Sequence, residues 1–258
     1  MTSIEDKRLM GYRGIPRRWL LALLLILYLF LGLISQNHFH WTYSGVRLSL
    51  ADCLVGQANS ILFSLLVVPV TLLWLQWEIK NELLPVVVVR RKSRQTIWMR
   101  QVGKIGLWAV TLAVGFGVLT TALGLFFSIA PINWDSQTSA FFVQTQQTLE
   151  IPFGWVAVIT IVSVAAHLFV SMALFLLCWW HLRRSAVVWI LYLTVTCAGL
   201  FLPYAGVLTG RIDLSYSSWL TNAWAPEWVG ALIMGAVWTV AGLVLSAGKE
   251  FLHNGFSA

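Results

Sequence analysis

Residues 153–180 read FGWVAVITIVSVAAHLFVSMALFLLCWW, a run with one histidine, His167, and no Asp, Glu, Lys or Arg. A bilayer's hydrocarbon core is about 30 Å thick, and roughly 20 apolar residues in a helix cross it. The run is longer than that, so it predicts a membrane-spanning helix. Comparable apolar runs recur along the chain, and together they predict an all-α polytopic membrane protein with one transmembrane domain, whose six spans lie at 19–35, 60–77, 105–130, 153–180, 186–205 and 228–247.

The composition excludes the other broad classes of protein. Of the 258 residues, 59% are apolar and only 10% are charged, whereas soluble domains average about 25% charged residues. Intrinsic disorder is excluded as well, because it requires low hydrophobicity and high charge. The net charge of +7 comes from basic residues beside apolar runs, so membrane topology and anionic lipid head groups explain it better than nucleic-acid binding.

The basic residues predict the orientation of the spans. If the N terminus is cytoplasmic, all but two of the 17 Lys and Arg residues, Arg47 and Arg211, fall on the cytoplasmic side. Cytoplasmic loops of membrane proteins carry such an excess of Lys and Arg. The sequence therefore predicts six helices with both termini in the cytoplasm, joined on that side by a long basic loop at 78–104.

No enzymatic or cofactor motif stands out. A phosphate-binding loop needs glycines at set positions followed by Lys and Ser or Thr, and the nearest string, GLVLSAGKE at 242–250, has the wrong spacing. Metal-ligand spacing and nucleophile motifs are also lacking, so we expect no catalytic residue, no metal and no cofactor in this chain. ATP hydrolysis, if the chain needs it, is expected in a partner subunit.

A few polar residues within the apolar runs are candidates for a substrate path. Ionisable groups inside a membrane are costly and usually face a bundle interior or a wet cavity. His167 therefore has two interpretations: it lines a path, or it forms hydrogen bonds to a neighbouring helix. Thr71, Thr194 and Tyr204 also have two interpretations: they line a path, or their hydroxyls bond carbonyls of their own helix.

The inner loop at 78–104 is the most informative polar segment. Its second half alternates bases with apolar residues, which is typical of a basic interfacial helix. It either anchors the chain to lipid head groups or forms a docking surface for a cytoplasmic partner, and the residues that would form this surface are Glu82, Arg90, Arg91, Arg94 and Trp98.

The string RRKSRQTIW at 90–98, followed by Lys104, resembles the Arg-x-x-Ser-Arg-x-x-x-Trp run of small ABC-2-type permeases. These permeases accompany bacterial peptide-antibiotic export and immunity systems. The resemblance implies that two permeases, identical or homologous, pair in the bacterial plasma membrane and that each docks a cytoplasmic ATP-binding subunit, which holds ATP and Mg. It also implies that the inner loop contributes the coupling helix.

Two functions from different classes follow. The first is a permease subunit of an ATP-driven exporter that moves an amphipathic substrate, either a peptide or a lipid-like molecule. The alternative is a non-transporting immunity or scaffold subunit of a membrane complex. In both cases membrane lipid is an expected partner and nucleic acid is not.

Overall fold

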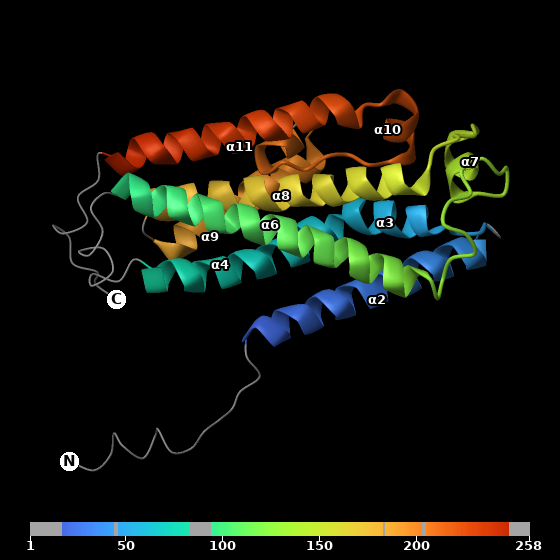
Figure 1. The fold of residues 1–258 in the computed structure, drawn as a ribbon, viewed down its shortest axis with the longest axis horizontal. Coiled ribbons are helices and arrows are strands. Elements are labelled where there is room, and N and C mark those ends of the chain that lie inside the picture. The colour runs from blue at the N-terminus through green and yellow to red at the C-terminus, as the bar shows by residue number, and fades with distance from the viewer. Residues whose placement is uncertain (1–16, 44–45, 83–93, 183, 203–204, 248–258) are drawn as a thin grey trace, which may run out of the picture.

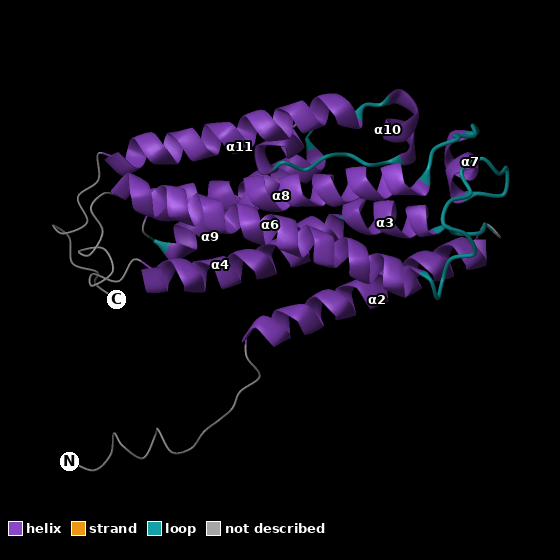
Figure 2. Ribbon diagram, in the orientation of Figure 1, coloured by secondary structure: helices purple, strands orange, loops and turns teal. Residues whose placement is uncertain are grey.

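The computed structural model describes residues 17–43, 46–82, 94–182, 184–202 and 205–247. Within these ranges the chain is helical, without a strand (Figure 2). The long helices lie side by side along one axis (Figure 1). They are α2 (Arg17–Tyr43), α3 (Leu50–Asn59), α4 (Val68–Glu82), α6 (Arg94–Gly124), α8 (Phe153–Leu182), α9 (Ser185–Phe201) and α11 (Trp224–Ala247).

Four short helical elements complete the described chain. A π-helical turn, η1 (Phe63–Val67), joins α3 to α4, and a 3-10 turn, η2 (Ala205–Thr209), follows α9. The helices α7 (Ala140–Thr145) and α10 (Tyr216–Thr221) lie at the same end of the bundle (Figure 1). We call this the outer end, and the opposite end the inner end.

Three helices, α6, α8 and α11, are long and apolar enough to cross a membrane. A fourth candidate span combines α3 with Phe63–Trp77, two pieces bent by 53° from one another. The apolar helices Leu23–Gln36 and Ser185–Phe201 are shorter. The described chain thus has three to four candidate spans; six spans and cytoplasmic termini stay predictions, since residues 1–16 and 248–258 lie outside the described part.

Several predicted boundaries differ from the structure. The third predicted span, 105–130, overlaps one 31-residue helix, Arg94–Gly124, so residues 94–104 are helix and not loop, and residues 125–130 lie beyond its end. No proline lies between residues 94 and 124, so the helix is continuous from the basic stretch into the apolar span. The segment 36–59, which separates the first two predicted spans, holds the end of α2 and all of α3. The helix α3 starts with a reciprocal capping box between Ser49 and Asp52.

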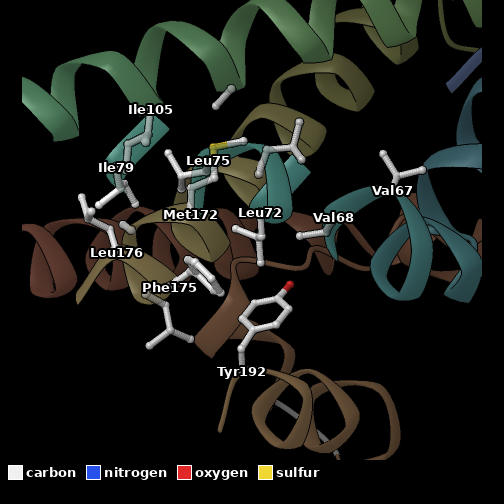
Figure 3. Close-up of a cluster of buried hydrophobic side chains, with 14 of the residues drawn as sticks. Val67, Val68, Leu72, Leu75, Ile79, Ile105, Met172, Phe175, Leu176 and Tyr192 are labelled. Carbon is white, nitrogen blue, oxygen red and sulfur yellow. The ribbon is translucent and has the colours of Figure 1, made fainter. Parts of the chain in front are cut away.

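The helix α8 is the centre of the bundle. In its most apolar window 67% of the residues are buried, against 33% for α6 and 22% for α11. Its side chains meet those of α4, α6 and α9 in the main apolar core (Figure 3), where Met172 and Phe175 lie among Leu72, Ile105 and Tyr192. Large apolar side chains on the outward faces of α6 and α11 remain exposed, as expected of helices that face lipid.

Tryptophan hydrogen bonds tie the helices together at the inner end. The fully buried Trp98 indole of α6 donates to the Thr239 carbonyl of α11 over 2.9 Å. Trp180 of α8 meets it edge to face, with ring centroids 5.5 Å apart, and donates to Gln101 Oε1 over 2.8 Å. The start of α6 is therefore held between α8 and α11.

A buried carboxylate organises the outer end. Asp52 is fully buried, and its two oxygens accept hydrogen bonds from Ser49 N and Oγ, Trp134 Nε1 and Tyr216 Oη, at 2.7 to 2.8 Å. Burial, followed by the nearby Asp52 charge, raises the pKa of Tyr216 well above its ordinary value, so its hydroxyl stays a donor. This carboxylate joins α3 to α10 and to the connection between α6 and α7.

The inner-end packing predicts a glycine requirement at residue 242. A Cβ atom on Gly242 would overlap the Trp98 ring, whereas one on Gly103 would meet nothing within 4 Å. Gly242→Ala should therefore lower the free energy of unfolding by about 1–3 kcal/mol through overpacking. Gly103→Ala should be neutral or raise it by up to about 1 kcal/mol, because Ala favours the helix. Thermal unfolding in detergent measures both, and equal midpoints for the two variants would contradict this packing.

Candidate functional site at two interrupted helices

Two helical segments are interrupted beside the middle of α8. The first interruption is at Ser60, which has a non-helical backbone and follows α3; residues 61 and 62 are again helical and lead into η1. The second follows α9, which ends at Phe201 because Leu202 is extended and precedes Pro203, whose ring disfavours a helical conformation in the residue before it. Each interruption frees backbone carbonyls from their helical partners.

His167, halfway along the 30 residues of α8, connects the two interruptions. Its Nδ1 lies 2.9 Å from the carbonyl oxygen of Thr209 in η2, and its Nε2 lies 3.1 Å from the hydroxyl of Ser64 in η1. Because a carbonyl only accepts, Nδ1 carries the proton and donates, and the Ser64 hydroxyl donates to Nε2. Both ring nitrogens are thus occupied, and all three residues are buried.

Side chains from several parts of the fold bond the other carbonyls. Tyr28 Oη of α2 donates to Gln57 O over 3.2 Å, and Arg211 Nη2 donates to Asn59 O, the last residue of α3, over 3.3 Å. The Trp238 indole of α11 donates to Leu208 O over 3.2 Å. The carbonyls freed at the two interruptions are therefore satisfied by side chains from other elements of the bundle.

Glycine is required where the chain leaves η2. Gly210 has a φ of +71°, which L side chains rarely adopt, and a Cβ there would lie 2.7 Å from Val170 Cβ of α8. This close approach allows the Thr209 carbonyl to reach His167 and, over 3.1 Å, the Ser171 hydroxyl. The next residue, Arg211, then points back to the end of α3.

An apolar crevice lies beside η1. It encloses about 190 Å³ and is lined by residues of α2, η1, α4 and α6 and by Leu168 of α8. Thr71 contributes the one hydroxyl of its lining, and this hydroxyl donates to Val68 O of its own helix over 2.6 Å. The crevice therefore presents an almost entirely apolar surface.

The structure does not bring the predicted path residues together. His167 has the role of a hydrogen-bonding residue between neighbouring elements, the second of its two interpretations. Thr71 lines the apolar crevice and bonds within its own helix, and Thr194 is exposed on α9, where its hydroxyl donates to Ile190 O of the same helix. Tyr204 lies outside the described residues.

The predicted docking residues are described only in part. Glu82 ends α4, but its side chain, like Arg90 and Arg91, lies outside the described part. Arg94 begins α6 at the inner end. The prediction that Trp98 contributes to a docking surface is wrong. Its indole is fully buried in the bundle, where it anchors α6.

Sequence reasoning missed Arg211 and the residues at the interruptions. Arg211 could have been noticed, because it is one of the two basic residues that the charge distribution leaves on the non-cytoplasmic side. Ser64 and Thr209 had no such signal, since they are ordinary hydroxyl residues far from His167 in the chain. Among the described residues, no group of three or more His, Cys, Asp or Glu side chains could hold a metal ion.

Comparisons with protein-family models, with curated proteins and with solved structures gave no match.

The hydrogen bonds of His167 predict a large effect of its replacement. His167→Phe removes both bonds and leaves the buried Ser64 hydroxyl without an acceptor, which should lower the free energy of unfolding by about 1–3 kcal/mol. Thr160→Val on the same helix is the matched control, because the buried Thr160 hydroxyl has no hydrogen-bond partner in the described structure. Thermal unfolding in detergent compares the two, and wild-type stability of His167→Phe would contradict the bridging role.

Proposed function

We propose that this chain is the permease subunit of an ATP-driven exporter in a bacterial plasma membrane. Its substrate would be amphipathic, either a peptide or a lipid-like molecule. The observation that carries the proposal is the meeting of two interrupted helices at His167, halfway along the central helix. In many transporters, interrupted helices at this depth form the substrate site, and their freed carbonyls and C-terminal ends attract cations.

The end of α3 has this kind of cation contact. The Asn59 carbonyl, at the C-terminal end of the helix, accepts from the Arg211 guanidinium. A helix C terminus carries a partial negative charge that favours a cation. An ion or charged substrate group that competes with Arg211 for this carbonyl would loosen the connection between α3 and η2, and such a contact can switch between two states.

The energy for transport would enter at the inner end. Because the sequence has no phosphate-binding loop, ATP and Mg would be held by a separate ATPase subunit, and a second permease would complete the complex. The connection from Glu82 to Arg94 is the inner segment long enough to dock a partner. Its far end is fixed by Trp98 to α11, so movement of this segment would be passed to both α6 and α11.

One observation favours the alternative, a non-transporting immunity or scaffold subunit. The ring of His167 is buried and bonded on both sides, so the middle of the bundle is closed in this conformation. A scaffold would keep this arrangement permanently, whereas an exporter would open it during its cycle.

Purification from native membranes in mild detergent tests the proposal. We expect an ATPase to co-purify, and Glu82→Lys or Arg94→Glu to reduce its recovery about tenfold, the effect of losing roughly 1.4 kcal/mol of binding energy. Arg184→Glu is the matched control, because Arg184 is exposed at the same end, in the turn between α8 and α9. Full ATPase recovery and full transport by both variants would exclude docking at this segment, and absence of any ATPase would favour the scaffold.

A further inference from the structure

A cavity of about 270 Å³ lies beyond the outward end of α9. It is lined by residues of α9, η2 and α11 and by the segment between η2 and α10, namely Gly199, Leu202, Gly206, Val207, Arg211, Asp213 and Glu227. Its size is just below the range of about 300–1,000 Å³ that is usual for small-molecule sites. It therefore suits a small polar group better than a whole drug-sized molecule.

The cavity exists because α9 is short. The 17 residues of this helix extend about 25 Å at 1.5 Å per residue, less than the hydrocarbon thickness of about 30 Å. Its neighbour α8 continues past it to Phe153. The space beyond the end of α9 is bordered instead by the irregular segment that carries Arg211 and Asp213.

Three charged side chains line this cavity, yet each of them bonds to uncharged groups. The Arg211 guanidinium donates to the Asn59 carbonyl. A Glu227 oxygen accepts from the Asp213 backbone N–H, and the Asp213 carboxylate accepts from Ser215 N and Oγ, each over 2.9 Å. A carboxylate has about four acceptor sites and a guanidinium has five donors, so all three retain capacity for a ligand of the opposite charge.

The surroundings of the cavity are apolar and exposed. Phe201 and Leu202, at the end of α9, are 77% and 59% exposed, and Val229 of α11 is 57% exposed. Next to a charged cavity, such a surface matches a molecule with a charged head and an apolar tail. A tail lying along these side chains would place its head at the cavity.

We propose that this cavity binds the zwitterionic head group of an aminophospholipid, with the ammonium near Asp213 and Glu227 and the phosphate near Arg211. The two carboxylates and the guanidinium supply complementary charges for both ends of such a head group. The exposed apolar side chains beside the cavity accommodate its acyl chains. This site stands independently of the export function proposed above, because it concerns binding alone.

Titration of short-chain phosphatidylethanolamine into the purified chain in detergent, followed by calorimetry, tests the site. We expect binding, and a loss of about tenfold in affinity for Glu227→Gln and for Asp213→Asn, since each removes one charge-assisted contact. Glu227→Gln keeps an oxygen that accepts from the Asp213 N–H. Asp213→Asn keeps an oxygen for the Ser215 N–H, and its new NH₂ group can donate to the Ser215 hydroxyl, which now accepts. Glu150→Gln removes an exposed carboxylate from another segment and should leave the affinity unchanged.

Titrations with a second lipid and with Arg211 variants identify which charges of the head group are recognised. Phosphatidylglycerol of the same chain length, which has no ammonium, should bind at least about tenfold more weakly, and so should Arg211→Gln with phosphatidylethanolamine. If Arg211→Gln does not fold, Arg211→Lys, which keeps the cation, should fold and retain binding. Equal affinity for phosphatidylglycerol, equal affinity for tail-free phosphoethanolamine, or unchanged binding by Glu227→Gln and Asp213→Asn would each overturn the assignment.

Discussion

Backbone carbonyls freed in the middle of a membrane bundle need hydrogen-bond donors from the protein itself, because the hydrocarbon supplies no water. Two helical segments of this chain are interrupted beside the middle of α8, and the structure meets this requirement at both. Tyr28, His167 and Trp238 supply donors from α2, α8 and α11, and Arg211 supplies one from the segment after η2. These bonds tie η1 and η2 to the surrounding helices.

The two ends of the bundle are built differently from its middle. At the inner end, Trp98 and Trp180 lock α6, α8 and α11 through indole hydrogen bonds and ring contact. At the outer end, the Asp52 carboxylate gathers four donors from three segments. The middle is held by hydrogen bonds to freed backbone carbonyls and by the His167–Ser64 pair, so a change of conformation there would exchange these bonds.

Much of the fold could be predicted from the sequence, but the partners of its polar residues could not. The uniform apolar character of residues 153–180 predicts α8, and Ser49 with Asp52 has the spacing of a capping box. Pro203 marks where α9 must end, although the predicted span continued to residue 205. Residues 94–104 have the composition of an interfacial helix. That this stretch is instead the first part of α6 follows from the packing of Trp98 against α11, which the sequence does not reveal.

The site itself was predictable only as a single residue. His167 stands out because an ionisable group in an apolar run is rare. Its partners are separated from it by 103 and 42 residues, and no periodic pattern connects them. Arg211 carries a recognisable charge, but its contact with the end of α3 depends on the sharp turn at Gly210, which is a property of the assembled bundle.

Hydrogen exchange measured by mass spectrometry on His167→Ala in lipid nanodiscs tests most directly whether His167 holds the two interruptions together. Loss of the imidazole removes the bonds to Ser64 and Thr209, so amide exchange should accelerate at both 60–64 and 205–211. Exchange at 98–105, which is held by the inner-end tryptophans, should stay at the wild-type rate. Unchanged exchange at either interruption, or equal acceleration along the whole of the bundle, would contradict the account.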